Sequence, residues 1–236
     1  MADGAKNDLT IYDTHAAEWW SDDVAWLRAL KNLVPARMAH FDRFVDWQDR
    51  DVLDLGCAGG FMAEALHDRG ACVAGIDPAA DAVAAARLHA KQTRRDIAYS
   101  VGVGEDLPYE DASFDAVVCV DVLEHVQDLA LVLLEVARVL RPGGWFLFDT
   151  INDTALARFA VITMAENVLG LLPKGTHDPA LFIRKKALVG SLENLGFEVQ
   201  GVTGLGPRGI TRRGDPTFGR LPFTGVLYMG AARLPG

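Results

Sequence analysis

The sequence is poor in cysteine, in positive charge and in long apolar runs, and each shortage argues against a class of protein. Only three of its 236 residues are cysteine. Cys57, Cys72 and Cys119 are widely spaced within apolar runs, so we expect buried, reduced thiols rather than disulfides or a zinc site. The formal net charge of −9 argues against nucleic acid as the main partner.

The chain shows no sign of a signal peptide or a membrane span. Its N-terminus lacks a basic start and an apolar run, and later apolar stretches are interrupted by Glu, Asn or Arg, so we expect a cytoplasmic protein. Residues 171–236 hold more than twice as many basic as acidic residues. The basic side chains there include Lys174, Arg184, Lys185, Lys186, Arg208, Arg212, Arg213 and Arg220. They form either ordinary solvated surface or one shared basic face.

Half of the residues are hydrophobic, and short apolar runs alternate with segments of helical spacing. Strands are expected at 51–55, 71–77, 97–102, 114–121, 145–150, 197–203 and 225–231. Helices are expected at 61–67, 81–91, 131–140, 152–173 and 185–195. This alternation predicts an α/β domain with a parallel sheet and a ligand site at the carboxyl ends of the strands.

A glycine-dense turn joins the first strand to the first helix of this core. Gly56, Gly59 and Gly60 allow a sharp bend and a close approach of a ligand to the backbone. The spacing does not fit the G-x-G-x-x-G fingerprint of dinucleotide folds. S-adenosylmethionine is the favoured ligand, because Asp54 would lie near its cationic amino acid end; a plain α/β turn is the alternative.

Acidic residues follow the next two strands. Asp77 ends the second strand about twenty residues after the turn, where α/β nucleotide sites place a carboxylate that binds ribose hydroxyls. The alternative is an Asp that starts the turn at Pro78. After the third strand, Asp106 could accept a hydrogen bond from an adenine amine and Leu107 could cover the ring, or Glu105 and Asp106 are plain loop charges.

The segment 9–48 is rich in tryptophan and has the spacing of amphipathic helices. It is either packing alone or a lid over the ligand site. Pro35 is expected to break the helical run. Arg37 could bind a carboxylate such as that of the methionine part of the cofactor, or it is a solvated charge.

The most informative polar cluster lies just past the fourth strand. If residues 121–128 are helical, Asp121, Glu124, His125 and Asp128 share one face. His125 could then take a proton from an acceptor hydroxyl, or the cluster could hold a divalent cation that lowers the pKa of a bound phenol. The alternative is that these acids cap a helix and stabilise its dipole.

Six stretches together carry a family resemblance. They are Val52-Leu-Asp-Leu-Gly-Cys-Ala-Gly-Gly60, Gly75-Ile-Asp77, Cys119-Val-Asp-Val-Leu-Glu-His-Val126, Leu140-Arg-Pro-Gly-Gly144, Thr150-Ile-Asn152 and Ala165-Glu-Asn-Val-Leu-Gly-Leu-Leu-Pro-Lys-Gly-Thr-His-Asp178. The combination resembles the ubiquinone biosynthesis O-methyltransferase family. The last stretch is its most selective part. Ala58 stands where the family usually has Gly, and Asp121 where it usually has Glu.

The resemblance implies the Rossmann-like class I methyltransferase fold, with a seven-stranded, mostly parallel sheet and helices on both faces. The chain is then a single domain of residues 1–236, made of an N-terminal lid (9–48), a cofactor-binding core (51–150), a substrate cap (152–183) and the C-terminal part of the sheet (185–236). The implied reaction is methylation of a catechol-type hydroxyl of a polyprenylated quinone precursor by S-adenosylmethionine.

Site residues follow from the resemblance together with the spacing. The resemblance implies cofactor contact by Arg37, Gly56, Asp77 and Val122, and a Mg²⁺ site from Asp121, Glu124 and His125. The full expected set of cofactor contacts is Arg37, Asp54, Gly56, Cys57, Gly59, Asp77, Pro78, Glu105, Asp106, Leu107, Val120 and Val122. Asp121, Glu124 and His125 are the expected catalytic residues, and His177 on the cap is a weaker candidate.

A polyprenyl acceptor resides in the membrane. We therefore expect the apolar face of residues 156–172 and the basic residues from Lys174 onward to lie against anionic lipid, as a peripheral contact at the inner face of the membrane. Three other functions stay open at this point: a methyltransferase for a soluble acceptor, a non-catalytic S-adenosylmethionine-binding subunit, and a nicotinamide oxidoreductase.

Overall fold

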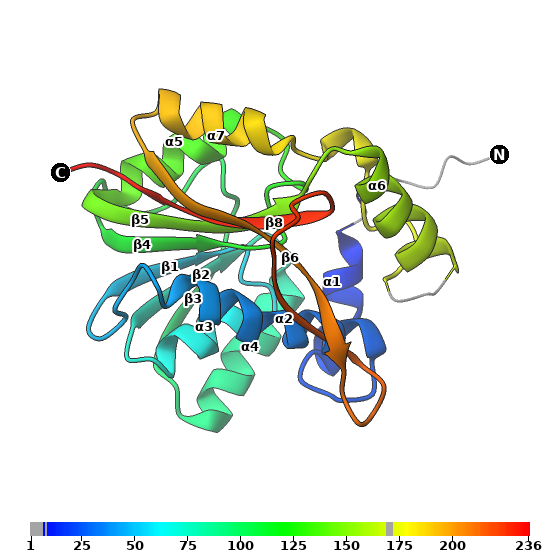
Figure 1. Cartoon of the computed structure of the whole chain (residues 1–236). Coiled ribbons are helices and arrows are strands. Elements are labelled where there is room, and N and C mark those ends of the chain that lie inside the picture. The colour runs from blue at the N-terminus through cyan, green and yellow to red at the C-terminus, as the bar shows by residue number, and fades with distance from the viewer. Residues whose placement is uncertain (1–6, 8, 169–171) are drawn as a thin grey trace.

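An eight-stranded sheet with helices on both faces organises the chain (Figure 1). The computed structural model describes residues 7, 9–168 and 172–236. The strand order is β3-β2-β1-β4-β5-β8-β6-β7. The strands are β1 (Asp51–Leu55), β2 (Cys72–Asp77), β3 (Ile97–Val101), β4 (Phe114–Cys119), β5 (Leu140–Ile151), β6 (Glu198–Ile210), β7 (Pro216–Leu221) and β8 (Leu227–Arg233). Strands β1 to β5 pair in parallel, and the order reverses beside β1, where ligands bind in such sheets.

Successive residues of the central strands point into two separate cores. Val52 packs with α2 (Ala25–Phe41), α3 (Phe61–His67) and α4 (Ala80–Thr93). Leu53 packs on the other face, with α5 (Leu129–Val139) and α7 (Lys185–Asn194). Because both faces are covered, these strands are apolar along nearly their whole length, which is why the sequence predicts them well.

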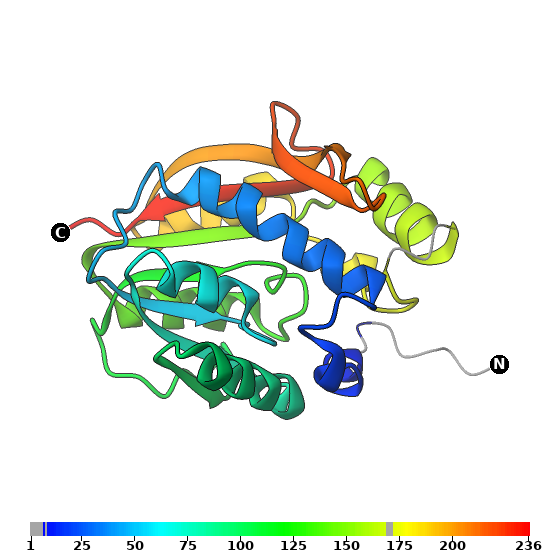
Figure 2. The ribbon, with the colours of Figure 1, turned by 90° about the horizontal axis from the view of Figure 1, so that it is seen from below.

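The prediction of seven strands is wrong by one. The Gly-, Pro- and Arg-rich segment after Thr203 lies outside the expected strands, but it forms a hairpin in which β6 extends to Ile210 and pairs with β7 in antiparallel fashion. Strand β7 lies against α2, and Arg28 donates to Asp215 at the tip of the hairpin (3.0 and 2.9 Å; Figure 2). Glycine and proline are depleted in strands in general but tolerated at a sheet edge, and β7 is an edge strand.

The N-terminal segment consists of α1 (Thr10–Thr14), the short helix η1 (Ala16–Glu18) and α2. The expected break at Pro35 is wrong, because Pro35 lies inside α2. A proline in a helix removes one backbone hydrogen bond. Packing offsets that loss, since Leu33, Met38 and Phe41 of α2 are all buried in the core.

The segment after β5 is not one regular helix. A short α6 (Ala155–Arg158) leads into a π-helical stretch, η2 (Phe159–Val168), and η3 (Pro179–Leu181) follows further along. Ala157, Val161 and Phe182 form a small core with Ile151 at the end of β5, so this cap is anchored to the sheet. Of the apolar face expected at 156–172, Leu156 is exposed, and Leu169 falls outside the described residues.

Cysteine burial follows the expectation at two of the three positions. Cys57 and Cys119 are buried and free. Cys72, the first residue of β2, is free but exposed. Among the helices of the described residues, none is both long and apolar enough to cross a bilayer.

Candidate active site

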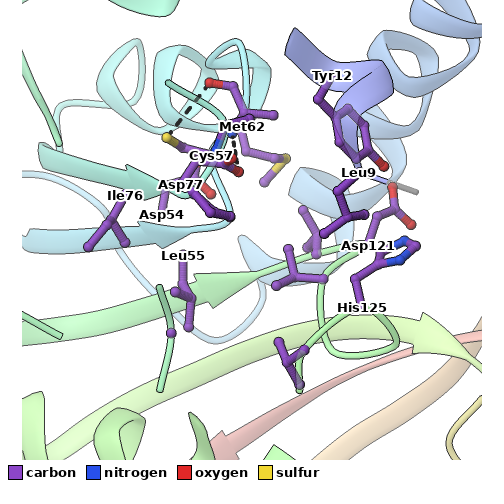
Figure 3. Close-up of a pocket in the computed structure, with 18 of the residues that line it drawn as sticks. Leu9, Tyr12, Asp54, Leu55, Cys57, Met62, Ile76, Asp77, Asp121 and His125 are labelled. Carbon is purple, nitrogen blue, oxygen red and sulfur yellow. Dashed lines mark hydrogen bonds between the residues drawn. The ribbon is translucent and has the colours of Figure 1, made fainter. Parts of the chain in front are cut away.

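A cavity of about 370 Å³ opens at the carboxyl ends of β1, β2 and β4, and the N-terminal segment covers it. Figure 3 shows Asp54, Cys57 and Asp77 on one side of this cavity, with Asp121 and His125 across from them and Tyr12 close to this second pair. Of the expected cofactor contacts, those that line the cavity are Arg37, Asp54, Gly56, Cys57, Asp77, Pro78, Glu105, Val120 and Val122. The described lining residues do not include Gly59, Asp106 or Leu107.

The glycine turn is fixed to its neighbours by both sterics and hydrogen bonds. Gly56 has a φ of 78°, and a Cβ there would lie 2.1 Å from Cγ2 of Val122. The amides of Gly56 and Cys57 both donate to the carbonyl of Ile76 in β2 (2.8 and 3.1 Å). Ala58, at the usual position of a glycine in the resembling family, has a φ of 41°, in the left-handed region that a side chain disfavours.

Asp77 is the acceptor that ties this turn to the end of β2. Its Oδ2 accepts from the amide of Ala58 at 2.9 Å and its Oδ1 from the amide of Ala79 at 2.8 Å. Burial raises the pKa of the Asp77 carboxyl, and the two amide donors oppose that rise. Each oxygen keeps a further lone pair, so a carboxylate held this way can still accept from a pair of hydroxyls in the cavity.

Asp54 is a buried acid without a partner. Its side chain is 1% exposed, and neither carboxyl oxygen has a hydrogen-bond partner among the described residues. Burial raises the pKa of Asp54 to about 7, although the nearby backbone amide of Ala63 opposes the rise. An unpaired carboxyl is costly to bury and is explained most simply by a ligand that carries a donor or a positive charge.

Residues expected around an adenine ring divide into two groups. Glu105 lines the cavity and accepts from the amide of Gln127 at 2.9 Å. Asp106 is exposed, and Leu107 is buried in the core beneath α5, where its amide donates to Glu135 at 2.8 Å. The structure therefore does not bring Asp106 and Leu107 to the cavity, because their loop turns toward α5 after Glu105.

The tryptophan-rich segment both packs and covers the site. The indole Nε1 of Trp20 donates to the carbonyl of Gly59 at 2.9 Å, and its ring stacks on His89 with centroids 3.5 Å apart. A Cβ at Gly59 would lie 2.0 Å from the ring of Trp19, which itself lines the cavity. Gly59 thus serves the contact between this segment and the turn rather than the cavity wall.

Arg37 is not a solvated charge. It is 3% exposed; its Nε donates to Asp149 Oδ2 at 2.5 Å, and its Nη2 forms an ion pair with Asp121. Asp149 also accepts from the amide of Asp121 at 2.8 Å, and burial raises the pKa of Asp149 to about 6 despite the guanidinium. Arg37 therefore links α2 to the ends of β4 and β5 while it lines the cavity.

Residues 121–128 are not helical, so the condition for one shared polar face is not met. They form a loop with a turn, in which Asp121 has a φ of 54° and the amide of His125 donates to the carbonyl of Val122 at 2.8 Å. Asp128 caps α5 and accepts from its first amides at 2.9 and 3.2 Å. The cap fixes the start of α5 after Asp128, so the four polar residues do not share a helical face.

Glu124 and His125 nevertheless come together in the wall between the cavity and the cap. Glu124 is 1% exposed; one carboxyl oxygen accepts from Thr150 Oγ1 at 2.7 Å, and the other has no partner. Burial, with Asp121 nearby, raises the pKa of Glu124 to about 8. His125 is 8% exposed, and burial, followed by His177, lowers its pKa to about 3.

His177 completes this group instead of Asp121. One ligand-type atom from each of Glu124, His125 and His177 lies within 4.8 Å of the others. Nδ1 of His177 is bonded to Glu166 Oε1 at 2.7 Å, and Glu166 also accepts from the amides of Gly175 and His177. Asp121 does not belong to this group and pairs with Arg37 instead.

Sequence reasoning missed three participants. Asp149 lies near the carboxyl end of the fifth strand, much as Asp77 lies at the end of the second, and that position was a usable signal. Asn7, whose side chain contacts His125, and Glu166, which holds His177, carry no such signal because only tertiary folding brings them to the site.

Comparison with known proteins gives a consistent assignment. Residues 53–148 match the family described as "Methyltransferase domain". The chain is 39% identical over 228 residues to the ubiquinone biosynthesis O-methyltransferase of Paracidovorax citrulli, covering 96% of this chain and 94% of that one. It is 37% identical over 234 residues to the protein of the same name from Chromobacterium violaceum, covering 99% of both.

The fold also matches solved structures. A crystal structure of an S-adenosylmethionine-dependent methyltransferase from Mesorhizobium loti superposes with a TM-score of 0.61 at 20% identity, covering 85% of this chain and 99% of that one. At that identity the likeness concerns the fold alone, and it confirms the predicted α/β methyltransferase architecture.

Proposed function

This chain belongs to the ubiquinone biosynthesis O-methyltransferase family, and we propose that it transfers the methyl group of S-adenosylmethionine to a catechol-type hydroxyl of a polyprenylated quinone precursor. The observation that carries the proposal is the cavity at the strand ends, which places a buried, unpaired acid, Asp54, beside a second acid, Asp77, that is fixed by two backbone amides. Such a pair suits a ligand with both a positive charge and a ribose.

We assign the cofactor contacts by chemistry. Asp54 accepts from the ammonium of the methionine part, and Asp77 accepts from the ribose hydroxyls. Nη1 of Arg37 makes no contact among those given for the described residues, so it is the donor left for the cofactor carboxylate. Gly56, Cys57, Pro78, Glu105, Val120 and Val122 supply backbone and apolar surface around the nucleoside.

The acceptor approaches from the side of the cap. His125 is neutral because burial keeps its pKa low, so its imidazole can accept a hydrogen bond from an acceptor hydroxyl. Glu124 adds a second buried carboxyl group with one oxygen that has no partner among the described residues, and Asp121 holds Arg37 in place. Once the hydroxyl has lost its proton, its oxygen attacks the methyl carbon while the carbon–sulfur electron pair returns to the sulfonium sulfur.

A Mg²⁺ ion held by Asp121, Glu124 and His125 does not fit this geometry. The Asp121 carboxylate is paired with Arg37, and the group that does form holds two imidazoles, whereas magnesium prefers oxygen ligands. No step is assigned to Mg²⁺.

We propose a peripheral membrane contact through the cap, because a polyprenyl acceptor resides in lipid. Leu156 and Phe159 are exposed on the cap, and Arg184 and Lys185 follow it in the chain. Sedimentation with anionic vesicles at low salt tests this. Phe159→Ser should reduce vesicle binding, and Leu88→Ser, at an equally exposed leucine of α4, should not. A parent protein that stays in the supernatant would contradict the contact.

The reaction itself is tested by mass spectrometry of prenylated catechol precursors incubated with the protein and isotope-labelled S-adenosylmethionine. We expect the labelled methyl on a ring hydroxyl. Methylation of soluble carboxylic acids or amines but not of prenylated catechols would favour the soluble-acceptor alternative. Unchanged turnover of His125→Ala in the assay of a partner enzyme would favour a non-catalytic subunit.

A further inference from the structure

Trp19 carries a buried donor that no described residue satisfies. It is 3% exposed, and its indole Nε1 has no hydrogen-bond partner among the described residues. Buried indole N–H groups usually find a partner, because burying a polar group without one is costly. An acceptor that comes from outside the chain is the simplest explanation.

The position of Trp19 brings this donor to the cofactor cavity. Trp19 lines the cavity, directly after η1 in the N-terminal segment that covers it. A Cβ built on Gly59 would lie 2.0–2.1 Å from Cδ1, Cγ and Nε1 of the indole, so Gly59 faces the flat side of the ring. The N–H lies in the plane of the ring, and this close contact therefore leaves it free for a ligand.

Packing fixes the indole of Trp19 from several sides. Its ring is tilted against Phe61, with centroids 5.6 Å apart, and it meets Trp26 edge to face at 6.1 Å. The next residue, Trp20, donates to the carbonyl of Gly59 at 2.9 Å and stacks on His89. Because these contacts hold the ring, its N–H is oriented in advance, and little freedom is lost when a ligand binds.

The first turn of α3 lies beside both Trp19 and the acid that we assign to the cofactor ammonium. Asp54 lies near the backbone amide of Ala63 in this turn, and Trp19 contacts Gly59 and Phe61 where the turn begins. The ammonium and the carboxylate of an amino acid are attached to one carbon atom. A ligand whose ammonium binds Asp54 therefore brings its carboxylate into the same neighbourhood, where Trp19 supplies an N–H.

We infer that Trp19 recognises the amino acid end of the cofactor, by donating from its indole Nε1 to one oxygen of the S-adenosylmethionine carboxylate. A carboxylate has two oxygens and about four acceptor sites, so this donor acts together with Nη1 of Arg37. The contact selects the intact cofactor over nucleosides that lack the amino acid part. It deepens the proposed function and rests on it, because the cofactor contacts of Asp54 and Arg37 are assigned there.

The test compares S-adenosylhomocysteine with its decarboxylated analogue, in which hydrogen replaces the carboxylate. Calorimetry should show that Trp19→Phe weakens binding of S-adenosylhomocysteine about 10- to 100-fold, the worth of one hydrogen bond to a charged group. The same substitution should weaken binding of the analogue by about threefold at most, because the phenyl ring keeps an apolar contact. The difference between the two ligands separates the contact to the carboxylate from any structural effect of the substitution.

Trp26→Phe is the matched control. Trp26 packs against Trp19 in the same aromatic group, but it is not among the described residues that line the cavity. The same loss of ring size at this position should change the affinity for both ligands equally or not at all. Urea unfolding without ligand checks that each variant is folded.

A second measurement uses the parent protein and so does not depend on the folding of a variant. The five tryptophans of the chain give indole N–H signals in a two-dimensional proton–nitrogen NMR spectrum. We expect S-adenosylhomocysteine to shift the Trp19 signal downfield, as a new hydrogen bond to a carboxylate does. The decarboxylated analogue should cause no such shift.

The inference is overturned if Trp19→Phe weakens both ligands to the same extent or weakens neither, if Trp26→Phe shows the same preference, or if both ligands move the Trp19 signal equally. Failure of the inference and failure of the proposed function are distinguishable. If the chain methylates prenylated catechols while Trp19→Phe binds S-adenosylhomocysteine as the parent does, only the assignment of Trp19 fails. If the contact to the carboxylate is found but no catechol is methylated, only the proposed reaction fails.

Discussion

Replacing Asp54 by asparagine should stabilise the ligand-free protein and weaken cofactor binding at the same time. The change keeps the size of the side chain and removes a charge that is 1% exposed and has no partner among the described residues. Both effects have one cause, the buried negative charge of Asp54. This charge destabilises the ligand-free protein, and it attracts the cationic end of the cofactor.

The magnitude follows from the pKa. Burial raises the pKa of Asp54 from 3.8 to about 7. Below about pH 4 the carboxyl is protonated in both the folded and the unfolded state, so it costs no stability. As the pH rises from about 4 to about 7, the unfolded chain ionises while the folded protein does not, and the folded protein loses stability. At 1.36 kcal/mol for each pH unit, the raised pKa costs about 1.5 kcal/mol of stability at pH 5, where the folded protein still holds the proton, and about 4 kcal/mol at pH 8, where the buried group is ionised.

The measurement is urea unfolding of the parent and of Asp54→Asn at pH 5 and pH 8. We expect the variant to gain stability over the parent, with a gain that grows by about 2–3 kcal/mol between the two pH values. Calorimetry should show S-adenosylhomocysteine binding weakened by about 10- to 100-fold, the worth of one hydrogen bond to a charged group.

Asp51→Asn is the matched control, because Asp51 begins the same strand β1 but is about half exposed and pairs with Arg141. It should change neither cofactor affinity nor the pH dependence of stability. If the difference in unfolding free energy between Asp54→Asn and the parent were the same at both pH values, the charge of Asp54 would not be the cause and the reasoning would fail.

Further predictions concern the turn and the end of β2. Gly56→Ala should cost about 2 kcal/mol or more and abolish measurable cofactor binding, because its Cβ would overlap Val122 at a φ of 78°; a variant with the parent's melting temperature would contradict this. Ala58→Gly should raise the free energy of unfolding by about 0.5–1 kcal/mol, because it removes the steric strain of an alanine with a left-handed backbone conformation. Chemical denaturation measures this change, and a lower free energy of unfolding would contradict the prediction. Asp77→Asn should weaken S-adenosylhomocysteine binding about tenfold by calorimetry, because an amide cannot accept from both backbone amides and ribose hydroxyls; unchanged affinity would exclude the ribose role.

Local patterns predicted the cofactor half of the fold well. Strand β1, the glycine turn and α3 follow one another without a break, and α3 begins and ends at the residues that the spacing indicates. Asp77 could be selected because it ends an apolar strand, and the structure does bring it to the turn. In this region the residues that decide the structure are neighbours in sequence.

The acceptor half depends on contacts between distant residues, and there the sequence misled. The spacing at 121–128 is compatible with a helix, but Asp128 competes by capping α5, so the helix starts later. Glu124 and His125 then meet His177, which reaches them only because the cap folds back from the end of β5. The hairpin of β6 and β7 was missed for a related reason, since it is stabilised by α2 rather than by its own composition.

A strand, a glycine turn and a helix also bind dinucleotides in other folds. The charge of the cavity explains why this unit binds a sulfonium nucleoside instead. Among the described residues that line it, the carboxyl groups of Asp13, Asp54, Asp77, Glu105 and Asp121 stand against the guanidinium of Arg37. That guanidinium is already paired with Asp121 and Asp149. A pyrophosphate would meet a surplus of carboxylates and a single guanidinium whose charge is already shared by two acids, so its burial would be strongly unfavourable. A ligand with a sulfonium and an ammonium group instead supplies positive charge to balance these carboxylates. The site therefore resembles dinucleotide folds in its backbone but not in the charge of its side chains.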